Sequence, residues 1–352
     1  MKKHVLLCSH NGENFIKDQI LSIINQEEKI DYIHIFDFAS TDTTYDQIIE
    51  IKETHKNYAW NISKINHAPG PAASFFYAIK KVSPLISSTD FILLADQDDV
   101  WLKNKVSSVQ QVFLKRIKSS PHNKLLIFHN VAITDEKLNI IQDTFYTGNP
   151  YSIPRDLSPD RLLLCNPIIG HTMALSGALL QLAAKKLQGE NYLMHDWAIS
   201  LLASRTGEIV YTGNIPLSLY RQHNANILGA ARKRKFTEKF YRTYFFSKKI
   251  IAQNQEFGKL LPKIQGQIIH PKKIDVFLEK INKKYLLNRF CRFIFWCRCE
   301  VWWGEDFDSV EFLNKIISIN LISEKLLTSA AEMALVIARN EAIYAKGLLR
   351  SS

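Results

Sequence analysis

The sequence of 352 residues is poor in cysteine and has no long apolar segment. Its five cysteines are odd in number and sparsely spaced, so they do not predict a disulfide framework, and Cys291, Cys297 and Cys299 lack the paired spacing of a zinc site. No apolar stretch approaches the roughly 18 residues that a membrane-spanning helix needs, and the first residues do not have the pattern of a secretory signal. These absences favour a reduced, cytoplasmic protein.

The positive charge is concentrated in the last third of the chain. The formal net charge is +11, yet residues 1–229 hold 22 basic and 22 acidic residues, whereas residues 230–352 hold 23 basic and 12 acidic ones. We therefore predict a domain boundary between residues 229 and 230. A neutral body with a basic C-terminal region indicates an anionic partner for that region, such as a membrane surface, a phospholipid-linked substrate or nucleic acid.

Strand and helix patterns alternate through the N-terminal body. Apolar runs at residues 5–8, 32–36, 60–65 and 91–95 predict strands, and apolar residues at helical spacing lie between them. Such alternation predicts an α/β fold whose mostly parallel sheet is covered on both faces. Further strands are predicted at residues 125–128 and 209–211, helices at 72–82, 175–186 and 195–203, and a helical pattern from 236 onward.

Polar clusters follow three of the predicted strands, at residues 9–11, 37–42 and 96–99. Ligands of open α/β sheets bind at the carboxyl ends of the strands. The third cluster holds three carboxylates, which repel one another at the end of a buried strand and are costly without a cation. Oxygen ligands suit Mg²⁺ or Mn²⁺, which retain waters and bind substrate phosphates. The alternative is a solvated acidic turn in which Asp99 caps the next helix.

The string Asp-Gln-Asp-Asp-Val-Trp at residues 96–101 resembles the metal motif of glycosyltransferase family 2, in its bacterial rhamnosyltransferase-like branch. Four other segments resemble motifs of that branch in the same order, at residues 7–16, 36–44, 195–197 and 220–226. The resemblance covers about residues 4–230. It implies a GT-A type catalytic domain over residues 1–229, with a mostly parallel mixed sheet, followed by a basic, aromatic-rich helical region over residues 230–352.

The resemblance also implies roles for individual residues. Asp196 is expected to be the general base that takes a proton from the attacking hydroxyl; its alternative is an acidic residue favoured by a helix N-terminus. Metal ligands are expected from Asp98 and His223. Contacts to the nucleotide-sugar are expected from Ser9, His10, Asn11, Asp37, Ser40, Asp96 and Arg221. The acceptor or sugar side is expected to include Asp99, Trp101, His171 and His195, although Trp101 also fits a packing role.

The sequence departs from the family's pattern on the nucleotide side. The second turn usually carries two acids followed by glycine, and here it reads Asp37-Phe38-Ala39. Phe38 cannot accept a hydrogen bond from a nucleobase. His10 stands where a tyrosine often stacks on the base. Three interpretations follow: the donor carries a different base, Asp37 or Ser40 holds the base instead, or the affinity for the donor is low.

The implied reaction is an inverting, metal-dependent transfer from dTDP-rhamnose or a UDP-hexose to a saccharide or lipid-linked acceptor. The implied setting is bacterial surface polysaccharide synthesis. Basic residues interleaved with Trp and Phe at residues 283–296 suit the inner face of an anionic membrane or a lipid-linked diphosphate. A helical cap packed on the catalytic domain is the alternative for these residues, and nucleic acid is not expected to bind.

Two other classes of function fit parts of the sequence. Asp96, Asp98 and Val100 fit the opening motif of a phosphatase of the haloacid-dehalogenase type, in which the first Asp is a covalent nucleophile. That motif normally lies on the first strand of its fold rather than about 90 residues into the chain. A non-catalytic module that binds a sugar nucleotide is the second alternative, and Phe38 is the residue that favours it.

Overall fold

The computed structural model describes residues 1–146, 157, 162, 166–187, 192–223, 252–253 and 256–260. The chain divides into two compact units, and the first consists of Met1–Ile153, Asn166–Arg232 and Lys263–His270. All the strands and helices discussed below belong to this first unit. The predicted boundary between residues 229 and 230, and the predicted helical region beyond it apart from residues 252–253 and 256–260, lie outside the described residues.

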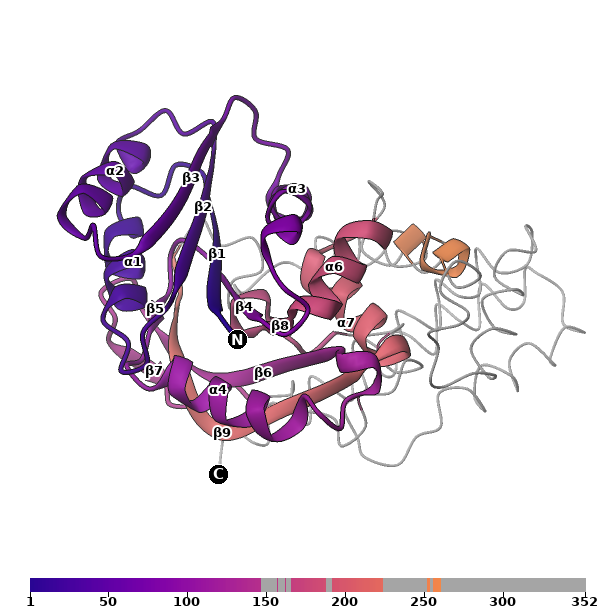
Figure 1. The fold of residues 1–352 in the computed structure, drawn as a ribbon. Coiled ribbons are helices and arrows are strands. Elements are labelled where there is room, and N and C mark those ends of the chain that lie inside the picture. The colour runs from indigo at the N-terminus through magenta and orange to yellow at the C-terminus, as the bar shows by residue number, and fades with distance from the viewer. Residues whose placement is uncertain are drawn as a thin grey trace, which may run out of the picture. The chain divides into compact units, whose positions relative to one another are not determined.

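The described residues of the first unit form a curled mixed sheet with helices on both faces (Figure 1). The strands are β1 Lys3–Ser9, β2 Tyr32–Phe38, β3 Ala59–Ile65, β4 Phe91–Ala95, β5 Val100–Trp101, β6 Leu125–Thr134, β7 Ile140–Gln142, β8 Ala174–Ser176 and β9 Glu208–Arg221. The helices are α1 Ile16–Ile24, α2 Thr44–Thr54, α3 Pro71–Val82, α4 Lys105–Arg116, α6 Gly177–Lys186 and α7 His195–Thr206. Short 3₁₀ turns lie at Ser83–Leu85, Pro121–Asn123 and Gly170–Thr172.

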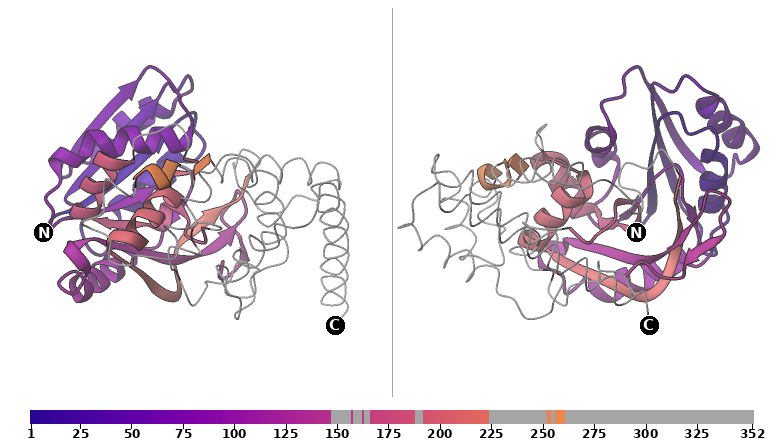
Figure 2. Two further views of the ribbon diagram at one scale, coloured as in Figure 1. Left: turned by 90° about the vertical axis from the view of Figure 1, so that its right-hand side faces the viewer. Right: turned by 180° about the vertical axis from the view of Figure 1, so that it is seen from behind.

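The strand order is β3-β2-β1-β4-β8-β6-β9-β5, with β7 paired to β6. The pairs β1–β2, β1–β4, β2–β3 and β6–β9 are parallel, whereas β8 is antiparallel to both of its neighbours. Figure 2 shows the long strands β6 and β9 curving side by side. The predicted α/β fold with a mostly parallel mixed sheet is confirmed. Its consequence is that the turns after β1, β2 and β4 meet at one edge of the sheet.

The strands predicted at residues 125–128 and 209–211 are longer in the structure, and the predicted start of one helix was wrong. Residues 174–176 form strand β8 and not the start of a helix, and α6 begins at Gly177. The Ser176 hydroxyl accepts a hydrogen bond from the Leu179 N–H at 3.3 Å, so it caps the new helix. A side chain at position 177 would collide with the Ser87 carbonyl oxygen, which explains the glycine there. Periodicity missed this boundary because apolar residues continue from the strand into the helix.

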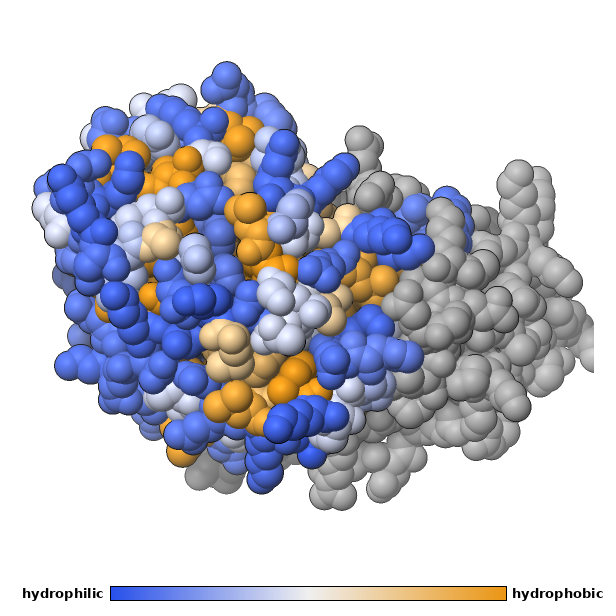
Figure 3. Space-filling model, in the orientation of Figure 1, coloured by the Kyte–Doolittle hydropathy of each residue, from blue (hydrophilic) through white to orange (hydrophobic). Residues whose placement is uncertain are grey.

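Apolar side chains fill both faces of the central strands. The face of β1 that carries Val5 and Leu7 belongs to a buried cluster with α1, α2 and α4, and these helices contribute residues such as Ile20, Ile48 and Val109. Leu6, which points to the opposite face, is also fully buried. Burial on both faces is why these strands read as continuous apolar runs. On the face shown in Figure 3, hydrophobic residues lie in small groups between hydrophilic ones.

None of the helices that the structure describes is both long enough and apolar enough to cross a membrane.

The turn after β2 contains a strained backbone position at Ala39, whose φ is 53°. This left-handed conformation costs a non-glycine residue about 1–2 kcal/mol. The turn keeps it because the Ala39 N–H donates to the Ile65 carbonyl oxygen at 2.7 Å. Ala39 occupies the position at which the family pattern has glycine.

We predict that Ala39→Gly raises the free energy of unfolding by about 0.5–1 kcal/mol, because glycine adopts a positive φ without the steric cost. Chemical denaturation of both proteins measures the difference. The matched control is Ala73→Gly on the exposed surface of α3, which should lower stability by about 1 kcal/mol. If the Ala39→Gly protein is less stable than the wild type, the backbone of Ala39 is not strained.

Candidate active site at the carboxyl ends of the strands

The turns after β1 and β2 are joined through the buried carboxylate of Asp37. Its Oδ1 accepts hydrogen bonds from the hydroxyls of Ser9, at 2.9 Å, and Ser40, at 2.5 Å. The Ser40 hydroxyl oxygen in turn accepts from the Asn11 N–H at 2.9 Å. The structure therefore brings together Ser9, Asn11, Asp37 and Ser40, four of the residues predicted to contact a nucleotide. Asp37 itself is fully buried, so its carboxylate supports the two turns from beneath.

The turn after β1 is also tied to the acidic turn after β4 by Gln97. The Gln97 Oε1 accepts from the His10 N–H at 2.8 Å, and its Nε2 donates to the His10 carbonyl oxygen at 3.0 Å. A side chain at Gly12 would collide with Gln97. The exposed His10 ring donates from Nδ1 to the Phe38 carbonyl oxygen at 2.6 Å. Phe38 turns its ring into the core, where it contacts the Tyr77 ring edge-on with centroids 5.8 Å apart.

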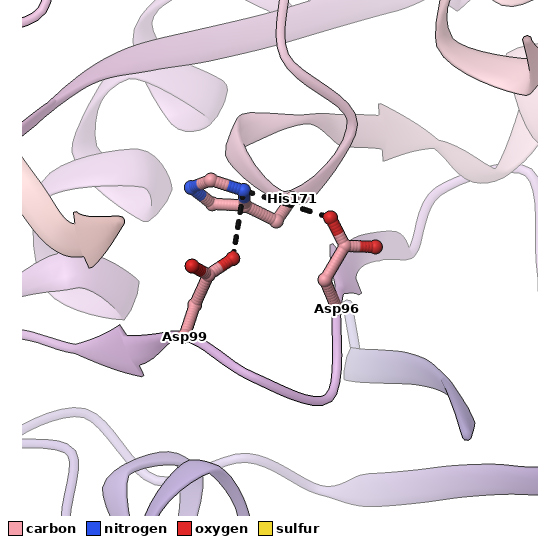
Figure 4. Close-up of side chains that lie close together, drawn as sticks. All are labelled: Asp96, Asp99 and His171. Carbon is pink, nitrogen blue, oxygen red and sulfur yellow. Dashed lines mark ion pairs between the residues drawn. The ribbon is translucent and has the colours of Figure 1, made fainter. Parts of the chain in front are cut away.

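Asp96, Asp99 and His171 converge at the acidic turn (Figure 4). The His171 Nδ1 lies 2.8 Å from an oxygen of Asp99 and 3.7 Å from an oxygen of Asp96. His171 and Asp99 are completely buried, whereas the Asp96 side chain is 37% exposed. The other Asp99 oxygen accepts from the Arg221 N–H at 3.1 Å. Among the described residues, this is the one group of three His, Cys, Asp or Glu side chains whose ligand atoms lie within 4.8 Å of one another.

Opposite charges dominate this cluster. Burial alone would lower the pKa of His171, but the carboxylates of Asp99 and Asp96 outweigh it and raise the pKa to about 9. Burial would likewise raise the pKa of Asp96, but the hydrogen bond and charge of His171 lower it. The pKa of Asp99 is raised, chiefly by burial and also by the charges of Asp98 and Asp96. His171 therefore behaves as an internal cation that compensates two carboxylates.

Lys105, at the start of α4, is a second buried basic side chain behind the acidic turn. Its Nζ donates to the His171 carbonyl oxygen at 2.9 Å and lies 3.8 Å from the centre of the Trp101 ring. Burial lowers the pKa of Lys105 well below its usual value, and the charges of Asp99 and Asp96 oppose this shift. Trp101 is 3% exposed, so its indole packs over the lysine.

Asp98 points to a different partner. Its Oδ2 lies 2.8 Å from the Nε2 of His223, whose ring stacks on Phe15 with centroids 4.6 Å apart. The two predicted metal ligands are thus adjacent, although they are separate from the cluster around His171. Arg221, predicted to meet the donor phosphates, donates from its guanidinium to Asp18 at 2.9 Å. That guanidinium also lies over the Phe15 ring, 4.9 Å from its centre.

Asp196 and His195 form the start of α7. The Asp196 Oδ1 accepts two hydrogen bonds, one from the backbone N–H of the next residue, Trp197, at 2.5 Å and one from the Asn166 side-chain amide at 3.3 Å. Burial raises the pKa of Asp196 to about 7, against the effect of these hydrogen bonds, and the charge of Asp96 adds to the rise. His195 is 2% exposed and stacks on Phe75 with ring centroids 3.9 Å apart. The carboxylate that was predicted to be the base is therefore one that titrates near neutral pH.

Comparison with known proteins agrees with this arrangement. Residues 4–118 match the family model for glycosyl transferase family 2, a range that runs from β1 to α4 and includes all three turns. The chain is 23% identical over 295 residues to the dTDP-rhamnosyl transferase RfbG of Shigella flexneri, covering 82% of this chain and 93% of that protein. The chain is a glycosyltransferase, and its residues 4–118 carry the match to family 2. Its rhamnosyltransferase-like character, expected from the motifs, is confirmed by the same relative.

A solved structure supports the fold of this glycosyltransferase. The structure of S. aureus TarS 1–349 in complex with UDP-GlcNAc matches with a TM-score of 0.51 and 15% sequence identity, over 99% of this chain and 92% of that one. Because the identity is low, the match speaks for the GT-A fold alone. The alternative of a phosphatase with Asp96 as nucleophile is set aside, because the acidic turn follows β4 of a glycosyltransferase sheet rather than its first strand.

Sequence reasoning missed two residues that hold the site of the glycosyltransferase together. Gln97 belongs to the string Asp-Gln-Asp-Asp-Val-Trp, but the sequence does not show that its side chain makes two hydrogen bonds to the backbone of His10. His10 lies in the turn after β1, 87 residues earlier in the chain. Lys105 is the first residue of α4, whereas Trp101 lies on β5, so no helical spacing links the two in the sequence. A lysine at the start of a helix is normally exposed, so only its burial identifies it.

We predict that Lys105→Met lowers the free energy of unfolding by about 2 kcal/mol, because it leaves the buried His171 carbonyl oxygen without its donor and the acidic turn without a neighbouring basic group. Denaturant titration at neutral pH measures the loss. The matched control is Lys103→Met, at an exposed position two residues earlier, which should change stability by less than about 0.5 kcal/mol. Equal stability of Lys105→Met and the wild type would show that Lys105 does not compensate the acidic turn.

Proposed function

We propose that this glycosyltransferase moves a sugar from a nucleoside diphosphate sugar to a hydroxyl of a saccharide or lipid-linked acceptor, with inversion at the sugar carbon and Asp196 as the general base. The observation that carries the proposal is the buried Asp196 carboxylate in the first turn of α7, whose Oδ1 is held by the Trp197 N–H and the Asn166 side chain and whose pKa burial raises to about 7. A general base is most effective when its pKa lies near the working pH. The charge of Asp96 acts on Asp196, so the two carboxylates belong to one site.

The donor is proposed from the chain's relatives and from the turns that the structure describes. RfbG is a dTDP-rhamnosyl transferase, and TarS has been solved with UDP-GlcNAc. We assign dTDP-rhamnose or a UDP-hexose to this chain. The exposed ring of His10 supplies a face on which a base can stack, while the core position of Phe38 and the full burial of Asp37 leave the base without a carboxylate partner there. We therefore expect a low affinity for the base.

A divalent cation, Mg²⁺ or Mn²⁺, fits best at Asp98 and His223, with Asp96 nearby. Two neighbouring ligands of an octahedral Mg²⁺ at about 2.1 Å lie roughly 3 Å apart, and the Nε2 of His223 lies 2.8 Å from the Oδ2 of Asp98. The cluster of Asp96, Asp99 and His171 fits less well, because Asp99 and His171 are completely buried, whereas the Asp98 side chain is 23% exposed. When bound, the cation would neutralise the charge of the leaving diphosphate.

The protein's own residues prepare the acceptor side. Asp196 lies at the N-terminus of α7, where Asn166 and the Trp197 N–H orient its Oδ1. In the neutral to alkaline range its carboxylate is ionised and can take the proton of the attacking hydroxyl. His171 pairs with Asp99 in the acidic turn and Trp101 packs over Lys105, and we assign these three residues a positioning role.

The setting of the reaction is proposed from the sequence and the relatives together. A dTDP-rhamnosyl transferase among the relatives supports bacterial surface polysaccharide synthesis. The basic, aromatic-rich residues 230–352 are proposed to meet an anionic membrane surface or a lipid-linked acceptor on the cytoplasmic side. The domain division between residues 229 and 230 is part of this proposal.

We predict that Asp196→Asn lowers the turnover rate by about 10²- to 10⁴-fold, because the amide cannot accept the proton. In the wild type the rate should fall as pH drops through about 7, where Asp196 becomes protonated. Transfer from radiolabelled dTDP-rhamnose and UDP-glucose, followed over pH 5–9, measures both effects. A variant as active as the wild type would contradict the assignment.

Stability provides the control for this variant. The pKa of Asp196 is raised in the folded protein, so the ionised carboxylate opposes folding, and this cost grows as pH rises from about 4 to about 7. Asp196→Asn should therefore melt at a higher temperature than the wild type at pH 8, and the difference should disappear near pH 4. The matched control, Asp46→Asn in the first turn of α2, should melt slightly lower with an unchanged rate.

A further inference from the structure

Phe15 directly precedes α1 and occupies the N-cap position of that helix. Asn, Asp, Ser and Thr are favoured at this position, because their side chains accept a hydrogen bond from the N–H groups of the first turn. A phenylalanine side chain cannot do so, and α1 has no side-chain cap. The local requirements of the helix therefore do not explain an aromatic residue here.

The hydrophobic core does not explain Phe15 either. The buried apolar cluster takes Ile16, Ile20 and Ile23 from α1. The Phe15 side chain lies outside that cluster and remains partly exposed, although Ile16 beside it is completely buried. The helix therefore packs its isoleucines on the sheet, and the Phe15 ring has other partners.

The partners of the Phe15 ring come from the end of β9. The His223 imidazole stacks on the ring with centroids 4.6 Å apart and an interplanar angle of 30°, and the Arg221 guanidinium carbon lies 4.9 Å from the ring centre. Arg221 is also held elsewhere, since it donates to Asp18 at 2.9 Å and to the Glu136 carbonyl oxygen at 3.2 Å. Arg221 therefore has anchors besides Phe15, whereas the face of the His223 ring rests on Phe15.

The stacked imidazole is one of the two proposed metal ligands. Its Nε2 lies 2.8 Å from the Asp98 Oδ2, close to the separation of neighbouring ligands on an octahedral ion. A histidine that binds a metal is usually oriented by a further contact outside the coordination sphere. A stack against the ring face can supply that orientation, because it restricts rotation of the imidazole and leaves the nitrogen at the ring edge free to face Asp98.

We propose that Phe15 is a positioning residue, which holds the His223 imidazole in the orientation that binds the divalent cation together with Asp98. This inference rests on the cation site of the proposed function. An aromatic stack is worth about 3- to 10-fold in an equilibrium constant. Because the stack is formed before the cation arrives, less ordering of the ligand is required when the cation binds.

The test measures the affinity for Mn²⁺ alone, without nucleotide, from the electron paramagnetic resonance signal of the free ion. We expect Phe15→Leu, which removes the ring and keeps an apolar side chain, to weaken Mn²⁺ binding about 3- to 10-fold. Phe15→Tyr keeps the ring face and should bind Mn²⁺ within about 2-fold of the wild type. The matched control is Phe113→Leu in the buried core, which should lower the melting temperature and leave the Mn²⁺ affinity unchanged.

A double-mutant cycle shows whether Phe15 acts through His223. His223→Ala should weaken Mn²⁺ binding at least about 10-fold, because it removes a ligand. Adding Phe15→Leu to His223→Ala should cause no further loss, because no imidazole is left to hold. A general structural role of Phe15 would instead weaken Mn²⁺ binding by the same factor with and without His223.

Three results overturn the inference: a Phe15→Leu protein that binds Mn²⁺ as tightly as the wild type, an equal loss of affinity with and without His223, or a Phe15→Leu chain that does not fold. A His223→Ala protein that binds Mn²⁺ as the wild type does is a different failure. It removes the cation site of the proposed function, and the inference about Phe15 with it.

Discussion

The site depends on how the repulsion between Asp96, Asp98 and Asp99 is compensated at the end of a fully buried strand. The charge of each of the three carboxylates is compensated in a different way. Asp99 is completely buried against His171 and the Arg221 N–H, and Asp98 lies against His223. Asp96 keeps 37% of its side chain exposed and only shares the charge of His171. His171 therefore compensates the buried Asp99, whereas Asp96 and Asp98 keep exposed side-chain surface for ligands.

The fold makes this compensation possible because it brings distant segments to one edge of the sheet. Parallel pairing of β2, β1 and β4 places three polar turns side by side. The strand β9, paired with β6 and β5, brings His223 to Asp98 across 125 residues of sequence. The turn Gly170–Thr172 carries His171 to Asp99 and lies against His195 and Asp196. Charge balance, strand order and the neutral-range pKa of Asp196 are thus parts of one arrangement.

The sequence was sufficient to predict the alternating strands and helices, because buried parallel strands read as apolar runs that end in polar turns. It was also sufficient to place Ser9, Asp37 and Asp96 at one edge. It could not show that Asp98 and Asp99 face different partners, since adjacent residues in a turn point in directions that only tertiary contacts decide. Lys105 and Gln97 were missed for a related reason: a lysine and a glutamine are exposed by default, and their contacts join segments 66 and 87 residues apart.

The central claim is that Asp98, with His223, holds the cation on which donor binding depends. Thermal-shift measurements with UDP, dTDP, GDP and CMP, each with and without Mn²⁺, test it most directly in the wild type and in Asp98→Ala, because a ligand that binds only the folded state raises the melting temperature. The account predicts a Mn²⁺-dependent increase with UDP or dTDP that is lost in Asp98→Ala. No increase with any nucleotide, or an equal increase in the variant, would contradict it.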